Sequence, residues 1–169
     1  MQGKPIATIE AGDVKSPSGA TIVADVSTAS DPFNLERFVS AQDLDETYGR
    51  ALEELRRGRK VTHWMWFVFP QITGLGHSAM TERYAIASLS EARAYWEHPV
   101  LGLRLLECSS IVASAEANTA VPIFGGIDAQ KLRSCMTLFR SAAPEAEIFQ
   151  RVLNRHFAGT ADPLTETAL

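Results

Sequence analysis

An aromatic run with a polar residue near each end is the part of the chain whose residue types best suit chemistry. Residues 62–71 read THWMWFVFPQ, so Trp64 and Trp66 lie between His63 and Gln71. Ligand pockets are concave apolar sites with a few converging polar groups, and this run could form the wall of one. Large aromatic side chains also fill protein cores, so the run could be core instead. Of its residues, His63 and Gln71 are the ones we expect to face a ligand.

His63 is the natural acid or base of such a pocket. Histidine changes its charge near neutral pH and can therefore accept or donate a proton during catalysis. If the domain is an enzyme, hydrolysis or group transfer on a bound ligand is the expected class of reaction. The sequence leaves open whether it is an enzyme.

A glycine-rich turn follows the aromatic run directly. Gly74 and Gly76 precede Ser78, which is a good residue to cap a helix N-terminus. The free N–H groups and the positive dipole of a helix start attract phosphates and carboxylates. The same residues also suit an ordinary turn and cap. The spacing fits neither a P-loop nor a dinucleotide fingerprint.

Two basic segments could complete an anion site. Lys131 and Arg133 follow a Gly-Gly pair, and residues 56–60 read RRGRK just before the aromatic run. Arg59 or Lys60 could reach an anion held at the glycine-rich turn. Each segment could equally be a solvated helix face.

The spacing of histidines and cysteines indicates no metal site and no cofactor. Besides His63, the histidines are His77, His98 and His156, and none has the spacing of a metal-binding motif. Cys108 and Cys135 fall among apolar residues at helical spacing. They are expected to be buried free thiols in a reducing compartment.

Charge and hydropathy narrow the classes of partner. The formal net charge is −4, which disfavours nucleic acid as the main partner. No run of about 18 apolar residues could span a membrane, and residues 1–30 carry no signal-peptide core. We therefore expect a cytoplasmic protein whose partners are a small anionic ligand or another protein.

The elements that must position these residues are helices. Residues 1–30 are rich in Gly, Ser, Thr and Ala and are expected to form a flexible or loosely docked arm. From residue 31 the apolar residues recur with a period near 3.6. The pattern predicts an all-α fold, a compact array of about six helices over residues 31–165, with a short tail at 166–169.

Local signals mark several helix ends. Asp43 or Asp45 can cap a helix that ends at Gly58, and Ser88 can cap the next long one. Residues 121–126 contain a proline and two glycines and predict a break, after which Asp128 can cap another helix.

The helix predicted after Pro99 carries two apolar rows. One row contains Leu103, Leu106 and then Ser110, and the other begins at Leu101 and ends at Val112. A helix that is apolar on two faces is typically buried. This helix is therefore predicted to be central and largely buried.

Several motifs together resemble a known family. They are DPFNL at 31–35 with Arg37, Phe38 and Gln42, HWMWF at 63–67, FPQ at 69–71, GLG at 74–76 with Ser78, Tyr84, and KLRS and MTLF at 131–134 and 136–139. In these motifs the chain resembles the bacterial family catalogued as domain of unknown function 1810, whose members are sometimes labelled calpastatin-like. The resemblance covers residues 31 to about 165 and implies an all-helical fold. It implies no catalytic or binding residue, because none is established for the family.

Two functions remain open. The first is binding of a small anionic or nucleotide-like ligand by His63, Trp64, Trp66 and Gln71 with the glycine-rich turn, and more weakly by Lys131 and Arg133. The alternative is a protein-interaction module without catalysis. Exposed aromatic residues such as Tyr95 and Trp96 would then form a patch, and residues 1–30 could become ordered on a partner.

Overall fold

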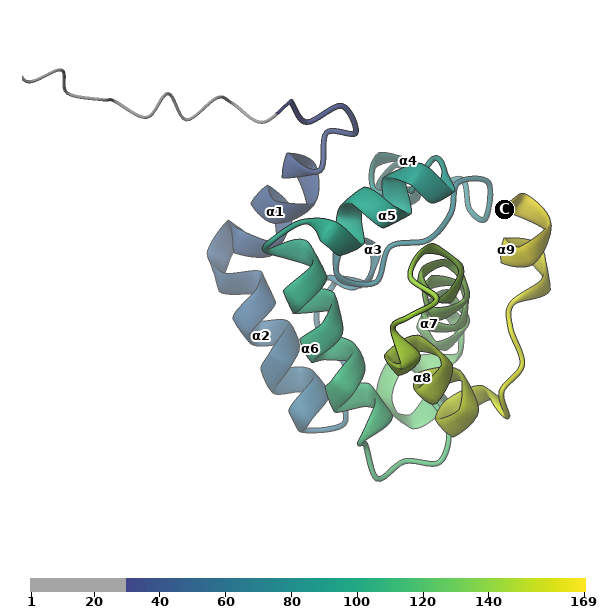
Figure 1. Ribbon diagram of the computed structural model, residues 1–169. Helices are drawn as coiled ribbons and strands as arrows, with labels where there is room; N and C mark the ends of the chain where they lie inside the picture. The colour runs from purple at the N-terminus through teal and green to yellow at the C-terminus, as the bar shows by residue number, and fades with distance from the viewer. Residues whose placement is uncertain (1–29) are drawn as a thin grey trace, which may run out of the picture. The chain divides into compact units, whose positions relative to one another are not determined.

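The computed structural model describes residues 30–169 and confirms the all-α class (Figure 1). The arm predicted for residues 1–30 lies, except for its last residue, outside the described part. The elements follow in the order α1 (Glu36–Asp43), the 3-10 helix η1 (Leu44–Glu46), α2 (Thr47–Arg56), α3 (Met65–Val68), α4 (Ala79–Arg83), α5 (Leu89–Glu97), α6 (Leu101–Ala113), α7 (Val121–Ala142), α8 (Glu147–Phe157) and α9 (Pro163–Ala168). An isolated parallel β-bridge joins Ile72 to Ile86.

The longer helices are those that the apolar period predicts. They are α1, α2 and α5 to α8, with at least eight residues each, whereas α3, α4 and α9 have four to six. Runs this short show no full amphipathic period, so the apolar pattern does not reveal them, and of the three only the start of α4 is anticipated, through Ser78 as its cap. Asp162 caps α9, because its carboxylate accepts a hydrogen bond from the Thr165 amide at 2.8 Å. Most of the tail expected at 166–169 is therefore part of α9.

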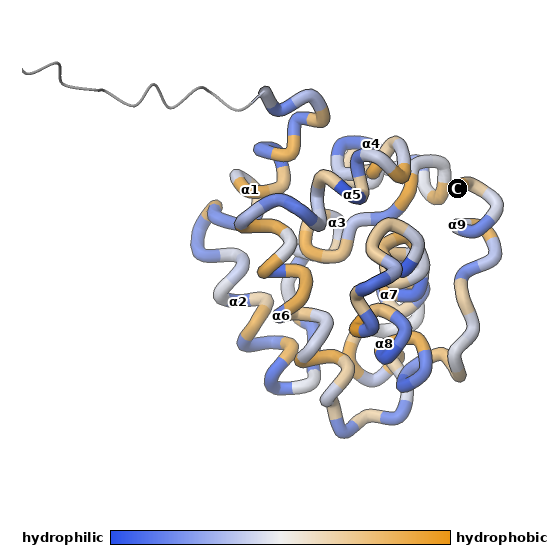
Figure 2. The backbone as a smooth tube through the Cα atoms, in the orientation of Figure 1, coloured by the Kyte–Doolittle hydropathy of each residue, from blue (hydrophilic) through white to orange (hydrophobic). Residues whose placement is uncertain are grey.

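The central helix is α7. It packs against α5, α8 and α9, while α6 packs against α2, α5 and α8. Hydrophobic positions recur along both helices (Figure 2). On α7 the side chains of Leu132, Cys135, Met136 and Phe139 are fully buried. Burial of side chains of this size stabilises the fold by roughly 1.5–3 kcal/mol each.

The prediction that α6 is central and largely buried holds for one of its two apolar rows and fails for the other. Its row from Leu101 to Val112 is buried, but Leu103 and Leu106 are 68% and 38% exposed. One covered face is enough to hold a helix in a fold, and a second apolar row can remain in solvent. The neighbours of α6 cover only its inner side.

The connections between helices correct one predicted cap. Neither Asp43 nor Asp45 caps α2, because Asp45 and Glu46 adopt left-handed backbone conformations that lead the chain from η1 into the helix. Gly58 ends α2 as predicted, with a φ of +69°. The predicted break near residue 125 is also present, since Gly125 has a φ of +76° and interrupts α7.

Candidate functional site

His63 lies exposed on a groove of about 940 Å³ that is formed by α1, the start of α2, the loop before α3, and α4. We call it the α1–α4 groove. The side chains that decide its chemistry are Arg37, Arg50, His63, Phe67, Arg83 and Tyr84. Segments that lie far apart in the sequence therefore meet at His63.

A buried carboxylate holds the loop that presents His63. Glu54 on α2 is 6% exposed and accepts hydrogen bonds from the amides of Val61 and Thr62 at 2.7 and 3.0 Å. It also accepts the Thr62 hydroxyl at 2.7 Å and the indole N–H of Trp64 at 2.9 Å. Burial alone would raise the pKa of Glu54, but these hydrogen bonds outweigh it and lower the pKa below its usual value.

Two aromatic side chains form the apolar floor of the α1–α4 groove. Phe67 from α3 meets Tyr84, the residue after α4, edge to face with ring centroids 5.2 Å apart. Tyr84 also packs against Phe38 of α1 at 5.8 Å. Both floor residues are at most 6% exposed, so the core fixes their positions. A rigid aromatic floor suits a flat apolar group on a ligand.

The arginines of the groove differ in whether a carboxylate of the protein already pairs with them. The guanidinium of Arg37 donates to four backbone carbonyls and pairs with the Glu91 carboxylate at 2.6 Å, so it is a structural wall. Arg83 lies over the Tyr84 ring at 5.3 Å, and Arg50 donates to the backbone carbonyl of Asp45. Within residues 30–169, neither of these two has a carboxylate at ion-pair distance.

The charge of the groove is positive. Its charged lining consists of Arg37, Arg50 and Arg83 against Glu36, and Glu91, which lies outside the lining, neutralises Arg37, so one positive charge remains in excess. A protein with a formal net charge of −4 thus has a local positive groove. Clefts lined by one sign of charge concentrate ligands of the opposite sign.

Three of the predicted ligand-binding residues meet at a second, smaller cavity. Gln71, Gly76 and Lys131 line a space of about 190 Å³, which we call the Lys131 pocket. The Lys131 ammonium lies 4.7 Å from the ring centroid of Trp66, so Trp66 is close by. The aromatic run thus presents its two polar ends, His63 and Gln71, to different cavities.

Lys131 shares its carboxylate partner with a second lysine. Asp128 bridges Lys131 and Lys60, at 2.8 Å to each ammonium. Burial alone would raise the pKa of Asp128, but the hydrogen bonds from the two lysines lower it. Asp128 therefore connects the segment after α2 to α7 instead of capping a helix. Lys60, which was predicted to reach an anion at the glycine-rich turn, pairs with Asp128 instead.

The glycine-rich turn has a structural part in the fold. The Ser78 hydroxyl accepts the Thr81 amide at 3.2 Å and so caps α4 as predicted. A Cβ on Gly76 would lie 2.9 Å from the Thr81 side chain, so a larger residue there would force Thr81 to shift. Gly74, with a φ of +90°, is exposed and lines neither cavity.

The other two predicted residues stabilise the fold. Trp64 is fully buried, with its N–H bonded to Glu54. Arg133 donates to the carbonyls of Thr160 and Ala161 at 2.9 and 2.7 Å, which holds the segment before α9 on α7. Neither lines the α1–α4 groove or the Lys131 pocket.

The residues that sequence reasoning missed are Arg50 and Arg83. Each is a single arginine on the polar side of its helix, and nothing in its spacing sets it apart. Only the packing of α1 against α2 and α3 brings these helices around one groove. Tyr84 and Phe67 do appear among the motifs, but without an indicated role.

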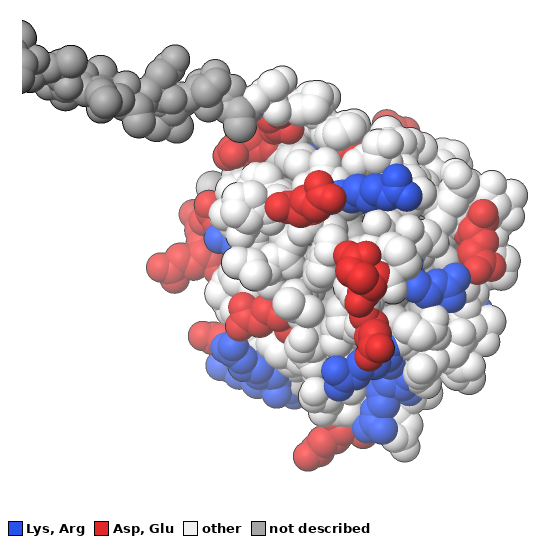
Figure 3. Space-filling model, viewed as in Figure 1, with Lys and Arg blue, Asp and Glu red and all other residues white. Residues whose placement is uncertain are grey.

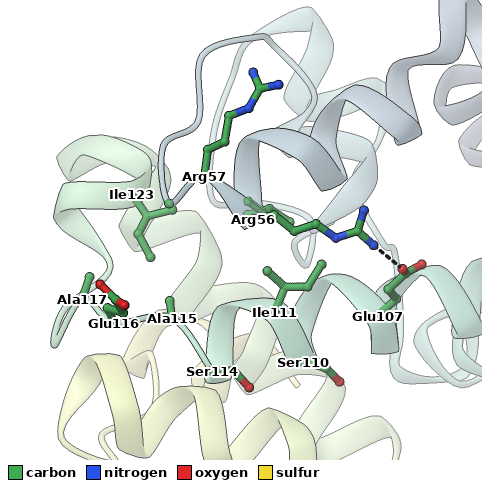
Figure 4. Close-up of a pocket in the computed structure, with 12 residues that line it drawn as sticks. Arg56, Arg57, Glu107, Ser110, Ile111, Ser114, Ala115, Glu116, Ala117 and Ile123 are labelled. Atoms are coloured by element: carbon green, nitrogen blue, oxygen red, sulfur yellow. Dashed lines mark hydrogen bonds and ion pairs between the residues drawn. The ribbon is translucent and has the colours of Figure 1, made fainter.

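A third cavity of about 720 Å³ lies between the C-terminal halves of α2 and α6. We call it the α2–α6 groove. Ile111 and Ile123 point into it, and Arg56 turns along its rim to pair with Glu107 at 3.1 Å (Figure 4). It contains no predicted ligand-binding residue.

The aromatic residues predicted to form an exposed patch are covered in the fold. Tyr95 is fully buried, and Trp96 is partly buried against Phe149 at 5.2 Å, so these aromatics form no exposed patch. Among the described residues, no cluster of His, Cys, Asp or Glu is arranged to hold a metal ion. No helix in this part of the chain is both long and apolar enough to cross a membrane.

Comparison with known proteins confirms the family resemblance. Residues 32–169 match the family described as Protein of unknown function (DUF1810). The chain is also similar to the crystal structure of the conserved hypothetical protein Rv1873 from Mycobacterium tuberculosis, with 47% identity and a TM-score of 0.79. That match covers 82% of this chain and 98% of the other. No curated protein matches the chain significantly.

Proposed function

We propose, for a chain that belongs to the DUF1810 family of proteins of unknown function, that the α1–α4 groove binds a small anionic ligand with a flat apolar group, such as a nucleotide. The observation that carries the proposal is the position of Arg50 and Arg83. Both arginines line the groove whose floor is Phe67 and Tyr84, and neither has a carboxylate partner within the described residues.

Each part of the groove matches a part of such a ligand. A guanidinium is planar and can hold a phosphate or carboxylate through two parallel hydrogen bonds. Phe67 and Tyr84 offer an apolar surface to a base or another flat ring. The volume of about 940 Å³ is at the upper end of the range usual for small-molecule sites.

His63 adds a group that can do acid–base chemistry. It is exposed at the groove, and the hydrogen bonds to Glu54 fix the backbone on its N-terminal side. Histidine can donate or accept a proton near neutral pH. Hydrolysis or group transfer on the bound ligand is therefore the activity to assay once binding is found.

A thermal-shift titration tests the proposal. The full chain is heated with ATP, AMP, adenosine or inorganic phosphate, and we expect AMP and ATP to raise the melting temperature more than the other two. Only these two ligands engage both the arginines and the aromatic floor. A ligand present at 100 times its Kd adds about 2.7 kcal/mol of stability, which shifts the transition measurably.

Variants locate the site. Arg83→Ala should weaken nucleotide binding by about tenfold, since one charge-assisted contact is lost. Arg151→Ala, which removes an exposed arginine of α8, should leave binding unchanged. Loss of binding in Lys131→Ala but not in Arg83→Ala would move the site to the Lys131 pocket and contradict the proposal.

A further inference from the structure

The outward face of α6 carries a row of two leucines and two serines that stays at least partly exposed within residues 30–169. Leu103 and Leu106 are 68% and 38% exposed, and Ser110 and Ser114 continue the same row toward the C-terminus. These residues recur every three or four positions and therefore share one side of the helix. The row begins with large apolar side chains and ends with small ones.

The α2–α6 groove lies beside the end of this row that carries small residues. Its floor contains Leu55 and Ile123, each only 2% exposed, and its open side contains Ile111 (Figure 4). The same helix thus carries two protruding leucines near one end and an apolar hollow near the other. A surface of this kind can be complementary to itself when it is turned end for end.

The two ends of α2 differ in charge, as the two ends of α6 differ in shape. Helix α2 runs parallel to α6, because Asp43 before α2 pairs with Arg104, and Arg56 in its last turn pairs with Glu107. The exposed residues Asp45 and Glu46 lie at the acidic N-terminal end of α2, and Arg56 and Arg57 at its C-terminal end, which stays basic although Glu53 pairs with Arg57 at 3.1 Å. Charges of both signs are interspersed on the face shown in Figure 3.

We propose that this face binds a second copy of the chain, with the two α6 helices antiparallel about a two-fold axis that passes between Glu107 and Ser110. Leu103 precedes Glu107 by four residues, and Ser114 follows Ser110 by four. The axis therefore brings Leu103 opposite Ser114 of the partner subunit, at the edge of the partner's α2–α6 groove.

The same axis also pairs opposite charges. The basic end of α2, with Arg56 and Arg57, comes to lie beside the acidic end of the partner's α2, with Asp45 and Glu46. The small side chains of Ser110 and Ser114 let the two helices approach closely. A parallel arrangement would instead bring acidic ends together and leucines together, so charge and shape both favour the antiparallel pair.

Sedimentation equilibrium tests this proposal on the full chain. Over concentrations from about 1 μM to about 1 mM, we expect a reversible monomer–dimer equilibrium, because a contact made chiefly by one helix pair is small. Leu103→Asp should weaken dimerisation at least tenfold. The matched control Ile127→Asp changes an apolar residue on α7 that is 76% exposed, and it should leave the equilibrium unchanged.

A charge reversal tests the orientation separately from the leucines. Arg57→Glu should weaken the dimer, and adding Glu46→Arg in the same chain should restore it, because the two residues face each other across the axis. Thermal melting of each variant shows whether it is folded. A protein that stays monomeric at all concentrations, or a dimer unaffected by Leu103→Asp and Arg57→Glu, overturns the proposal.

Discussion

At the scale of single residues, the most important polar side chain near His63 is one that is buried and hydrogen-bonded within the fold. Glu54 is almost fully buried, yet it accepts hydrogen bonds from Val61, Thr62 and Trp64, on both sides of His63. A buried carboxylate is stable only when such donors surround it. The sequence gives no sign of this, because Glu54 follows Glu53 on a helix and resembles any other surface glutamate.

Replacement of Glu54 by glutamine should destabilise the protein. Glutamine places an amide donor among N–H donors, so we expect Glu54→Gln to lower the free energy of unfolding by about 1–3 kcal/mol at pH 7. The control Glu53→Gln removes an exposed pair with Arg57 and should change it by less than about 0.5 kcal/mol. Urea denaturation measures both.

The effect of Glu54 should also depend on pH in a defined direction. Its pKa is lowered in the folded state, so the unfolded state binds more protons near pH 4. The stabilisation is present above the unfolded pKa of about 4.3 and is lost as the pH falls through the folded pKa. The difference between wild type and Glu54→Gln should therefore be smaller at about pH 3 than at pH 7. An equal difference at both pH values would show that folding does not lower the pKa of Glu54.

At the scale of helices, the apolar period predicts where a helix lies better than how deeply it is buried. The period identifies α6 and α7 from sequence, but it predicts burial for both apolar rows of α6, and the row with Leu103 and Leu106 is exposed. Burial depends on which neighbours a face receives, and those neighbours come from elsewhere in the chain. The single turn of α3 escapes prediction for another reason, because four residues carry no period.

Two glycine substitutions test the packing of α5 against α6. A Cβ on Gly102 would lie 1.9 Å from the Trp96 carbonyl oxygen, so Gly102→Ala requires the helices to move apart. We expect a loss of about 3 kcal/mol in the free energy of unfolding.

Gly49→Ala is the matched control within α2, since a Cβ there would meet nothing within 4 Å. It should stabilise the protein by about 0.5–1 kcal/mol, as alanine is the better helix former. Thermal or urea denaturation measures both variants. Similar effects of the two substitutions would contradict the close approach of α5 and α6.

At the scale of the whole molecule, folding divides the residues that the sequence groups together. His63 and Gln71 end one aromatic run, but the buried side chains between them anchor α3 in the core, and the two ends reach different cavities. The groove that surrounds His63 is completed by Arg50 and Arg83 from other helices. Sequence reasoning can therefore find one wall of this site, and only the packing of the helices supplies the opposite one.

The measurement that tests the nucleotide-binding proposal most directly is a titration of the isotope-labelled full chain with AMP, followed through the backbone amide signals in NMR spectra. We expect the shifted signals to cluster on α1, the start of α2, the loop at His63, and α4. Shifts that cluster instead around Gln71 and Lys131, or around the α2–α6 groove, would contradict the assignment of the site. No shifts at millimolar AMP would contradict nucleotide binding itself.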